Sequence, residues 1–366
     1  AVERAFGPGA KRLSAYSLTG AALFGPAAVM LTIVDYLPAV LLPDTTTGRC
    51  LASVLVLAAC AALQLSGLRN TSRITLALSA LATALLLAGS VLVLALHSAP
   101  PQPLPPLQPG RLGHALLLLF WAVVGWEVAG NYGAEVADPR RTVPRAAVIA
   151  ALAVGLVDVA VGAGMQYGVF PPQAGHGVAG LLFPMFGAFS PWIMGGLTAA
   201  LCATTYLMFV GAVSRLAAHL AEEGGLPSVL AGRNRFGAPH VVLLLYALAH
   251  TVQIVLAGLG ILDVAKIVAI ADGFFLVNAL LGTLAAAKLL PGAAVRTTAG
   301  LLSLGVALVL LQSSWTILAI AAALAAWLLR PASLSARGEP RPHPQGCPAL
   351  GGSRPARFRA GPAACV

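Results

Sequence analysis

The chain has 366 residues, of which 58% are apolar and only 9% are charged, and its formal net charge at pH 7 is +10. A soluble domain carries about a quarter charged residues, so this composition cannot cover a water-facing surface and excludes a soluble enzyme, a disordered protein and a nucleic-acid module. A transmembrane helix needs about 20 mostly apolar residues, which leaves room for about ten crossings of a bilayer.

Charged residues and prolines divide the apolar runs into predicted membrane-spanning helices. In chain order the first eight are expected at about 13–43, 51–67, 74–96, 113–135, 145–169, 189–213, 239–260 and 263–289. The uncharged run from Thr297 to Leu329 would measure about 50 Å as one helix, beyond a hydrocarbon core of about 30 Å. We therefore predict two short helices within 296–330 that turn near Gln312. Residues 332–366, rich in Pro, Arg, Gly and Ala, are predicted to form a disordered tail.

The positions of lysine and arginine predict how these spans are oriented. If the N-terminal end is cytoplasmic, the outside loops hold only Arg49, Arg111 and Lys266, and the inside loops hold the other basic residues. An excess of basic residues in short cytoplasmic loops sets the orientation of membrane proteins. The loops at 138–145 and 215–238 and the C-terminal tail are therefore predicted to be cytoplasmic.

Acidic residues within the spans are the first candidates for function, because a carboxylate is costly in a bilayer. Asp35 falls near a span end, where water can solvate it, whereas Glu127, Asp158 and Asp272 fall near mid-depth. No lysine or arginine lies at that depth, so each acid is expected to be protonated, exposed to water or served by backbone donors. These three are our candidates for coupling to a proton or another cation. The structural alternative is an acid that is paired with a neighbour or faces a wet crevice.

Glycines flank Glu127 in the fourth span, at Gly125 and Gly130. Glycine at mid-membrane allows a helix to break, and bare backbone is tolerated there only where it lines a cavity or packs against protein. A broken helix presents its positive end to an anionic group, such as the carboxylate of an amino acid. The pair Asp272-Gly273 repeats this pattern in the eighth span.

Two stretches resemble the amino acid–polyamine–organocation (APC) superfamily of permeases. They are Phe120-Trp121-x-x-x-Gly125-Trp126-Glu127 with Glu135-x-x-Asp138-Pro139-Arg140-Arg141-Thr142-x-Pro144-Arg145-Ala146, and Ser214-Arg215-Leu216-Ala217 through Glu223-Gly224-Gly225-Leu226-Pro227 to Asn234, Gly237 and Pro239. The likeness covers residues 1–331. Within the superfamily it is greatest to bacterial permeases like the methionine and branched-chain amino acid exporter.

This resemblance implies an all-α integral membrane protein with a LeuT-like fold, in which two inverted repeats of five helices precede two more. On that plan, residues 13–97 are the remainder of the first repeat, 113–290 form the second and 296–330 form the last two helices. Two helices of the first repeat would then lie upstream of residue 1. A transport-incompetent fragment is therefore an alternative reading, and this chain alone is expected to transport poorly.

The resemblance also implies that substrate binds at a broken sixth helix, with the eighth and tenth helices beside it. Carried over residue by residue, the substrate-binding candidates are Val124, Gly125, Trp126, Glu127, Thr204, Thr205 and Asp272. Asp272 stands where the exporter-like pattern has Asn, and the span 74–96 lacks the Lys with which some relatives mimic a bound cation. We expect secondary active transport of neutral amino acids across the cell membrane by alternating access, coupled to a proton or another cation.

A membrane-embedded enzyme is the alternative from another class. It would need paired acids or a His/Ser cluster at one membrane face, and the sequence shows neither. The 5 cysteines include no CxxC pair, and no Gly-rich phosphate cradle is present. We therefore predict no metal site and no cofactor. His250, inside the seventh span, fits a satisfied polar residue better than a proton relay.

Overall fold

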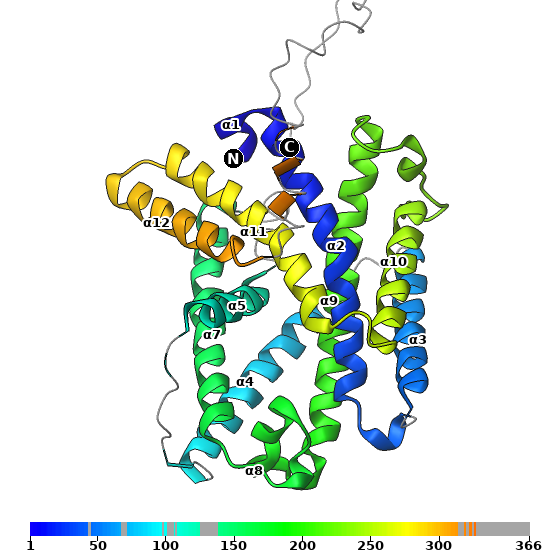
Figure 1. Ribbon diagram of the computed structural model, residues 1–366, viewed down its shortest axis with the longest axis vertical. Coiled ribbons are helices and arrows are strands. Elements are labelled where there is room, and N and C mark those ends of the chain that lie inside the picture. The colour runs from blue at the N-terminus through cyan, green and yellow to red at the C-terminus, as the bar shows by residue number, and fades with distance from the viewer. Residues whose placement is uncertain are drawn as a thin grey trace, which may run out of the picture. The chain divides into compact units, whose positions relative to one another are not determined.

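The computed structural model describes residues 1–42, 45–66, 72–96, 99–100, 106, 108–124 and 138–313, together with 318–319, 322–323 and 326. Its long helices are α2 (Pro8–Tyr36), α3 (Thr46–Leu65), α4 (Ser72–Leu96), α7 (Pro139–Tyr167), α9 (Ser190–Glu222), α10 (His240–Gly258), α11 (Val264–Leu289) and α12 (Ala293–Leu310) (Figure 1). Shorter elements include α1 (Val2–Phe6), α5 (Pro109–Leu119), α8 (Phe183–Phe186) and the 3-10 turns η2 (Phe120–Val123), η4 (Pro172–Ala174) and η5 (Gly177–Leu182).

Within the described part of the chain, eight helices are long and apolar enough to cross a membrane. They lie in eight of the predicted spans, which confirms the all-α membrane class. The predicted fourth span, 113–135, is described only as far as residue 124. The predicted last span at 314–329 and the predicted tail at 332–366 fall wholly or almost wholly outside the described residues.

Three predicted boundaries are wrong. α2 ends at Tyr36 rather than at residue 43, because Leu37 precedes Pro38 and a residue before proline is driven into extended conformation. α7 already begins at Pro139, so the predicted loop 138–145 forms the first turns of a helix that contains Pro144. α9 continues to Glu222 rather than stopping near 213.

The extension of α9 has an amphipathic cause. Arg215 and His219, four residues apart, lie on its exposed side, whereas Ala217 and Leu220 are buried. Residues four apart share one face of a helix, so the polar residues that suggested a loop instead form a solvated stripe. The predicted cytoplasmic loop 215–238 is therefore helical over its first third.

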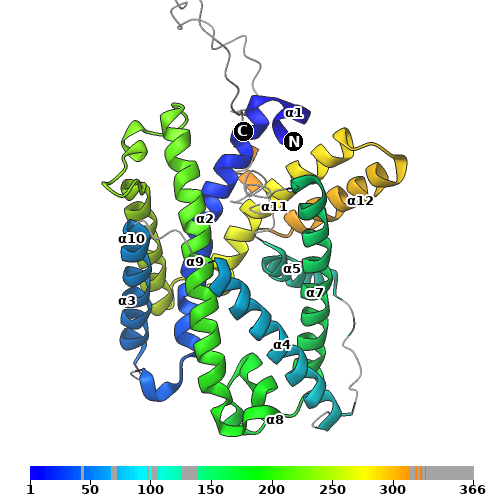
Figure 2. The same ribbon diagram turned by 180° about the vertical axis from the view of Figure 1, so that it is seen from behind.

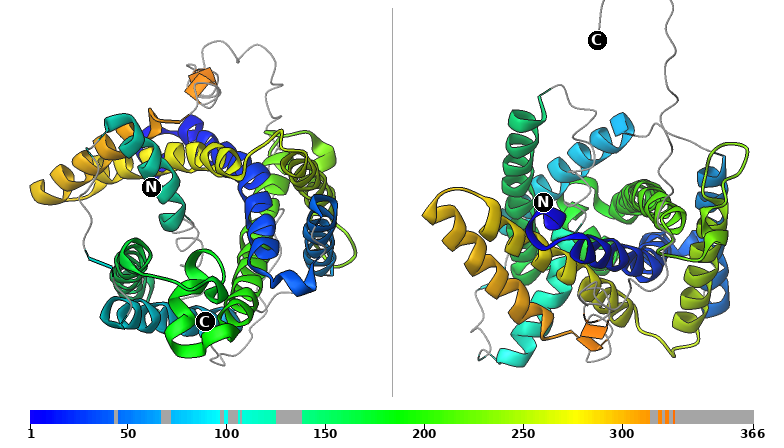
Figure 3. Two further views of the ribbon diagram at one scale, coloured as in Figure 1. Left: turned by 60° about the horizontal axis from the view of Figure 1, so that its bottom comes forward. Right: turned by 90° about the horizontal axis from the view of Figure 1, so that it is seen from above.

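α2 is the helix around which the others pack: it contacts α3, α9, α10 and α11 (Figures 1 and 2). Figure 3 shows α2 and α11 side by side. Glycines on α2 permit this approach, because a Cβ atom at Gly20 would lie 2.9 Å from Phe274 on α11. Small residues bring helices together in membranes in this way, since the lipid supplies no hydrophobic drive for helix association.

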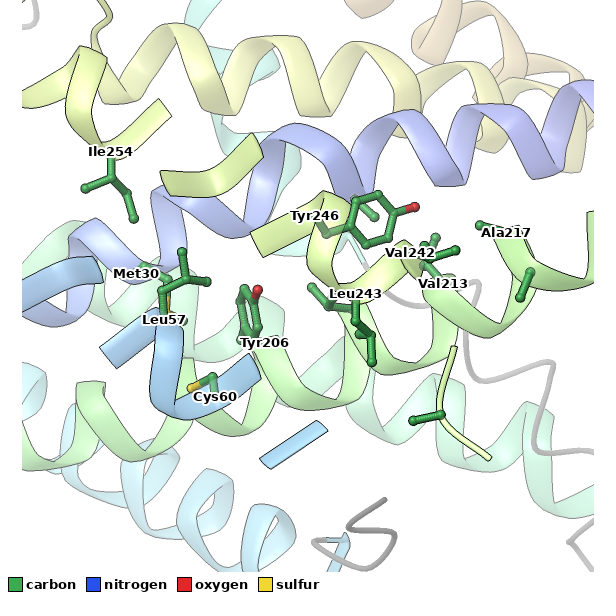
Figure 4. Packing of buried hydrophobic residues seen from close by; sticks show 14 of the residues in the cluster. Met30, Leu57, Cys60, Tyr206, Val213, Ala217, Val242, Leu243, Tyr246 and Ile254 are labelled. Carbon is green, nitrogen blue, oxygen red and sulfur yellow. The ribbon is translucent and has the colours of Figure 1, made fainter. Parts of the chain in front are cut away.

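A buried cluster joins α2, α3, α9 and α10 (Figure 4). Met30 of α2, Leu57 of α3, Tyr206 of α9 and Tyr246 of α10 are each at most 2% exposed. Helix α4 instead contacts α7, and α5 contacts α11 and α12. Among the described helices, α3, α9, α10 and α11 thus pack directly against α2, whereas α4 and α5 pack against other helices.

Pro26 interrupts the hydrogen bonding of α2, and α10 compensates for it. Proline has no N–H, so the carbonyl of Ala22, four residues earlier, has no partner within its own helix. His250 of α10, 0% exposed, approaches this carbonyl with its Nε2 at 2.9 Å. A carbonyl only accepts, so Nε2 carries the proton, and Nδ1 accepts from the hydroxyl of Tyr206 at 3.2 Å.

A neighbouring residue of α10 makes a parallel contact. Gln253 donates from Nε2 to the carbonyl of Leu23 at 2.8 Å and to that of Ala249 at 3.1 Å. Each ring nitrogen of His250 has a partner, one on α2 and one on α9, which agrees with the satisfied role predicted for it.

Replacing His250 with Leu should lower the free energy of unfolding by roughly 2–3 kcal/mol, because the Ala22 carbonyl would be left buried without a donor. The same replacement in a Pro26→Ala background should be less damaging, because an alanine at that position restores the helical N–H. Detergent-induced unfolding of the four proteins of this double-mutant cycle measures the coupling. His114→Leu, at an exposed position of α5, is the control. Equal losses in both backgrounds would contradict this account of Pro26.

Candidate functional site

A cavity of about 1410 Å³ lies between α2, η2, α7, α9, α11 and α12. It exceeds the roughly 300–1,000 Å³ of typical small-molecule sites. The N-terminal half of α2 forms one wall, from Lys11 to Leu18, and α11 forms another, from Phe275 to Thr283. The cavity is therefore large enough to admit an amino acid together with water.

Helix α5 and the 3-10 turn η2 lead the chain to the cavity. α5 ends at Leu119, η2 continues to Val123, and Val124 is extended with φ −74° and ψ 152°. Val124 lines the cavity. The chain therefore leaves helical geometry beside the cavity, immediately before the predicted break. Gly125, Trp126 and Glu127 lie outside the described residues, so their roles as binding residues stay predictions.

Asp158 faces the cavity from α7. Ala151, Val154, Gly155 and Asp158 all line it, and their spacing of three and four residues places them on one face of the helix. Asp158 is exposed. Asp158 therefore lies at the cavity surface rather than in the packed interior. This position agrees with the structural alternative of an acid that faces a crevice.

Asp272 differs from Asp158 in its surroundings. It is 0% exposed, and among the residues that the structure describes neither of its carboxylate oxygens has a hydrogen-bond partner. It shares one face of α11 with Phe275 and Ala279, which line the cavity three and seven residues further along. Its neighbour Ala271 belongs to the cluster that packs α11 against α2 and η2. Asp272 is thus a bare acid one helical turn beyond the cavity.

Aromatic rings pack beside the cavity one helical turn from Asp272. Phe275 makes an edge contact with Trp121 of η2 at a centroid distance of 6.3 Å and a tilted contact with Phe209 of α9 at 5.5 Å. These rings come from three different elements, so they join α11, η2 and α9 at this level.

The cavity wall also holds a polar pair that the sequence did not indicate as functional. The hydroxyl of Ser14 on α2 donates to Oδ1 of Asn278 on α11, and both residues line the cavity. The signal for this pair was weak, because single polar residues near the ends of apolar spans are common. Its position makes the Asn278 amide a further candidate for contact with substrate.

Ionisable pairs line the cavity near the N-terminal part of α2 and the C-terminal part of α9. Nζ of Lys11 lies 3.4 Å from Oε2 of Glu3, and Nε2 of His219 lies 3.3 Å from Oε1 of Glu223, with all four side chains substantially exposed. Exposed pairs of this kind contribute little to stability. They bring both signs of charge to this part of the cavity, whereas Leu18, Phe120, Val124 and Phe275 form an apolar part of the wall, which we call the cavity floor.

The two threonines predicted to bind substrate do not line this cavity. The Thr204 hydroxyl donates to the carbonyls of Ala200 and Leu201 in its own helix, both at 2.9 Å. Thr205 is exposed and lies four residues before Phe209 on one face of α9. The structure therefore brings Val124 and Asp158 to one cavity, places Asp272 one turn beyond it and leaves Thr204 facing its own backbone.

Residues 1–330 of the chain match the model of a protein family that is described as "Amino acid permease". This chain belongs to that family. It is therefore a multi-pass membrane protein of a family that transports amino acids. Among curated proteins, none matches the chain. The APC resemblance is confirmed at the level of the permease family, whereas the exporter-like subgroup and the expected upstream helices stay predictions.

The permease depends on the close contact of α2 with η2. A Cβ atom at Gly25 would lie 2.7 Å from Cη2 of Trp121 and 3.3 Å from Cβ of Ala271. Gly25→Ala should therefore displace Trp121, destabilise the fold by roughly 1–3 kcal/mol and reduce amino acid uptake. Unfolding and uptake assays test this, with Gly196→Ala as control, because a Cβ atom there meets nothing within 4 Å. Equal behaviour of the two variants would contradict the packing argument.

Proposed function

We propose that this permease carries neutral amino acids across the cell membrane by alternating access, and that Asp272 couples the movement to a proton or another cation. The observation that carries this proposal is the complete burial of Asp272, one turn from a large cavity and with no hydrogen-bond partner in the described part of the chain. Burying an ionised carboxylate without a partner is very unfavourable. The site therefore favours binding of a proton, a cation or the ammonium of a substrate.

The cavity floor supports a neutral side chain on the substrate. Leu18, Phe120, Val124 and Phe275 line it, and none of them can pair with a charged substrate group. A charged side chain would lose its hydration there without compensation. The charged lining residues lie elsewhere: Glu3, Lys11, Arg12 and Glu223 near the N-terminal part of α2 and the C-terminal part of α9, and Asp158 on α7.

The substrate carboxylate is proposed to meet backbone N–H groups of the interrupted helix that follows Val124. Freed backbone donors and the dipole of a half-helix favour an anionic group at such a break. The extended conformation of Val124 supports this placement. The substrate ammonium would then turn towards Asp272 or Glu127.

The direction of opening follows from charge. Lys11 and Arg12, on the N-terminal part of α2, and His219, on the C-terminal part of α9, line one end of the cavity. An excess of basic residues marks the cytoplasmic side of a membrane protein. We infer that this end faces the cytoplasm, as do the segments 138–145 and 215–238 and the C-terminal tail, so the structure would represent an inward-open state.

Asp272→Asn should abolish coupling but retain exchange, because the amide resembles the protonated acid in shape and cannot bind or release a proton. In proteoliposomes, gradient-driven accumulation of labelled neutral amino acids should fall about tenfold or more, while counterflow under equal concentrations continues. Asp138→Asn, an exposed acid at the start of α7, is the matched control. Accumulation by Asp272→Asn at the level of the control would overturn the role of Asp272.

Glu127→Gln tests the second acid in the same assay. If Glu127 binds the substrate ammonium, its replacement should weaken both counterflow and accumulation, because substrate itself would bind less tightly. Counterflow measured over a range of substrate concentrations should then show a KM raised about tenfold. Unchanged uptake with unchanged pH dependence would show that Glu127 has neither role.

A further inference from the structure

A second cavity lies at the opposite end of α2. It has a volume of about 580 Å³ and is bounded by the end of α2, the start of α3, the segment around η4 and η5, and the start of α9. α2 has 29 residues and so measures about 43 Å. Residues 11–18 of α2 line the large cavity, whereas Asp35 and Tyr36 line this one. The two cavities are therefore far apart along the helix.

The wall of this outer cavity, as we call it, is tightly packed around Tyr36. A Cβ atom at Gly177 would lie 2.6 Å from the Tyr36 hydroxyl, and one at Gly195 would lie 2.6 Å from the Tyr36 carbonyl. Gly177 also has a φ of 57°, in the left-handed region that glycine adopts without strain. The ring of His176 stacks on Tyr36 at a centroid distance of 5.1 Å. These contacts fix an aromatic surface at the cavity.

Two opposite charges line the outer cavity without neutralising each other. Asp35 and Arg49 are both exposed, and within the described residues neither side chain takes part in an ion pair or a hydrogen bond. Their charged atoms are therefore more than 4.0 Å apart. A molecule that carries both charges offers a partner to each of these residues within one cavity.

The helix dipoles disfavour both charges. Asp35 is the second-last residue of α2, where the negative end of the dipole repels an anion, and Arg49 is the fourth residue of α3, near its positive end. A base at the end of α2 and an acid near the start of α3 would instead interact favourably with both helix dipoles. The arrangement therefore weakens helix stability slightly, which a binding role would explain and a purely structural role would not.

We propose that the outer cavity is a second amino acid site, distinct from the site near Asp272. The Arg49 guanidinium binds the α-carboxylate, the Asp35 carboxylate binds the α-ammonium, and the apolar side chain lies against Tyr36 and Trp192. Typical ligand sites have similar volumes. This inference rests on the proposed function in one respect, because the ligand class is taken from the substrate proposed for the permease.

Trp192 supplies a direct reporter, because it lines the outer cavity and is 47% exposed. L-Leucine titrated into the purified protein should change the tryptophan fluorescence, and Trp192→Phe should lose that component of the change. Leucinamide, which lacks the carboxylate, and 4-methylpentanoate, which lacks the ammonium, should each bind more weakly than leucine. Glycine, alanine and methionine extend the series of neutral probes.

Arg49→Ala and Asp35→Asn should each raise the Kd reported by Trp192 about three- to tenfold. Arg49→Lys should recover part of the loss, because it retains the cation. Arg111→Ala, an exposed arginine that lines neither cavity, is the control and should bind like the unaltered protein. The proposal is overturned if no neutral amino acid changes the Trp192 component, or if both variants bind as tightly as the control.

The Asp272→Asn variant separates this inference from the proposed function. It should retain the Trp192-reported binding while losing accumulation in proteoliposomes. Normal accumulation by Asp272→Asn together with weakened Trp192-reported binding in Arg49→Ala would refute the role of Asp272 and support the outer site. Loss of accumulation without any Trp192-reported binding would refute the outer site alone.

Discussion

The arrangement of the described helices depends on one constraint, which is that a backbone carbonyl freed in a membrane must find a donor. Pro26 frees the Ala22 carbonyl in α2, and His250 of α10 donates to it at 2.9 Å. Gln253 binds the next carbonyl, that of Leu23, at 2.8 Å. These bonds specify which faces of α2 and α10 meet, whereas apolar contact alone would leave that choice weakly determined.

The register of α2 against α10 also determines what lies on its other faces. With Ala22 turned towards His250, Gly20 and Gly25 meet Phe274 and Trp121 closely. This contact positions α11 and η2, and therefore the aromatic layer around Phe275 and the acid beyond it. A hydrogen bond on one side of α2 thus helps to position a candidate coupling site on the other side.

The class of fold and most of the spans follow from composition and charge, because a bilayer permits few structures for so apolar a chain. Boundaries were less predictable: Arg215 and His219 suggested a loop, although their four-residue spacing continues α9 as an amphipathic helix. Among the residues that lie at or near the cavity, residue type and depth suggested Asp158 and Asp272, whereas the family resemblance suggested Val124. Depth could not indicate that Thr204 bonds to its own helix, nor that Ser14 meets Asn278, because both depend on rotation about the helix axis.

His250 and Asp272 illustrate why burial alone does not identify a functional residue in a membrane protein. Both are 0% exposed and lie in apolar helices. The ring nitrogens of His250 each have a partner, so its polarity is fully used in joining α2, α9 and α10. The oxygens of Asp272 have none among the described residues, so no described contact compensates the cost of removing this acid from water. A proton or cation that binds Asp272 would supply the missing interaction. A transporter can use such binding energy to favour one conformation over another.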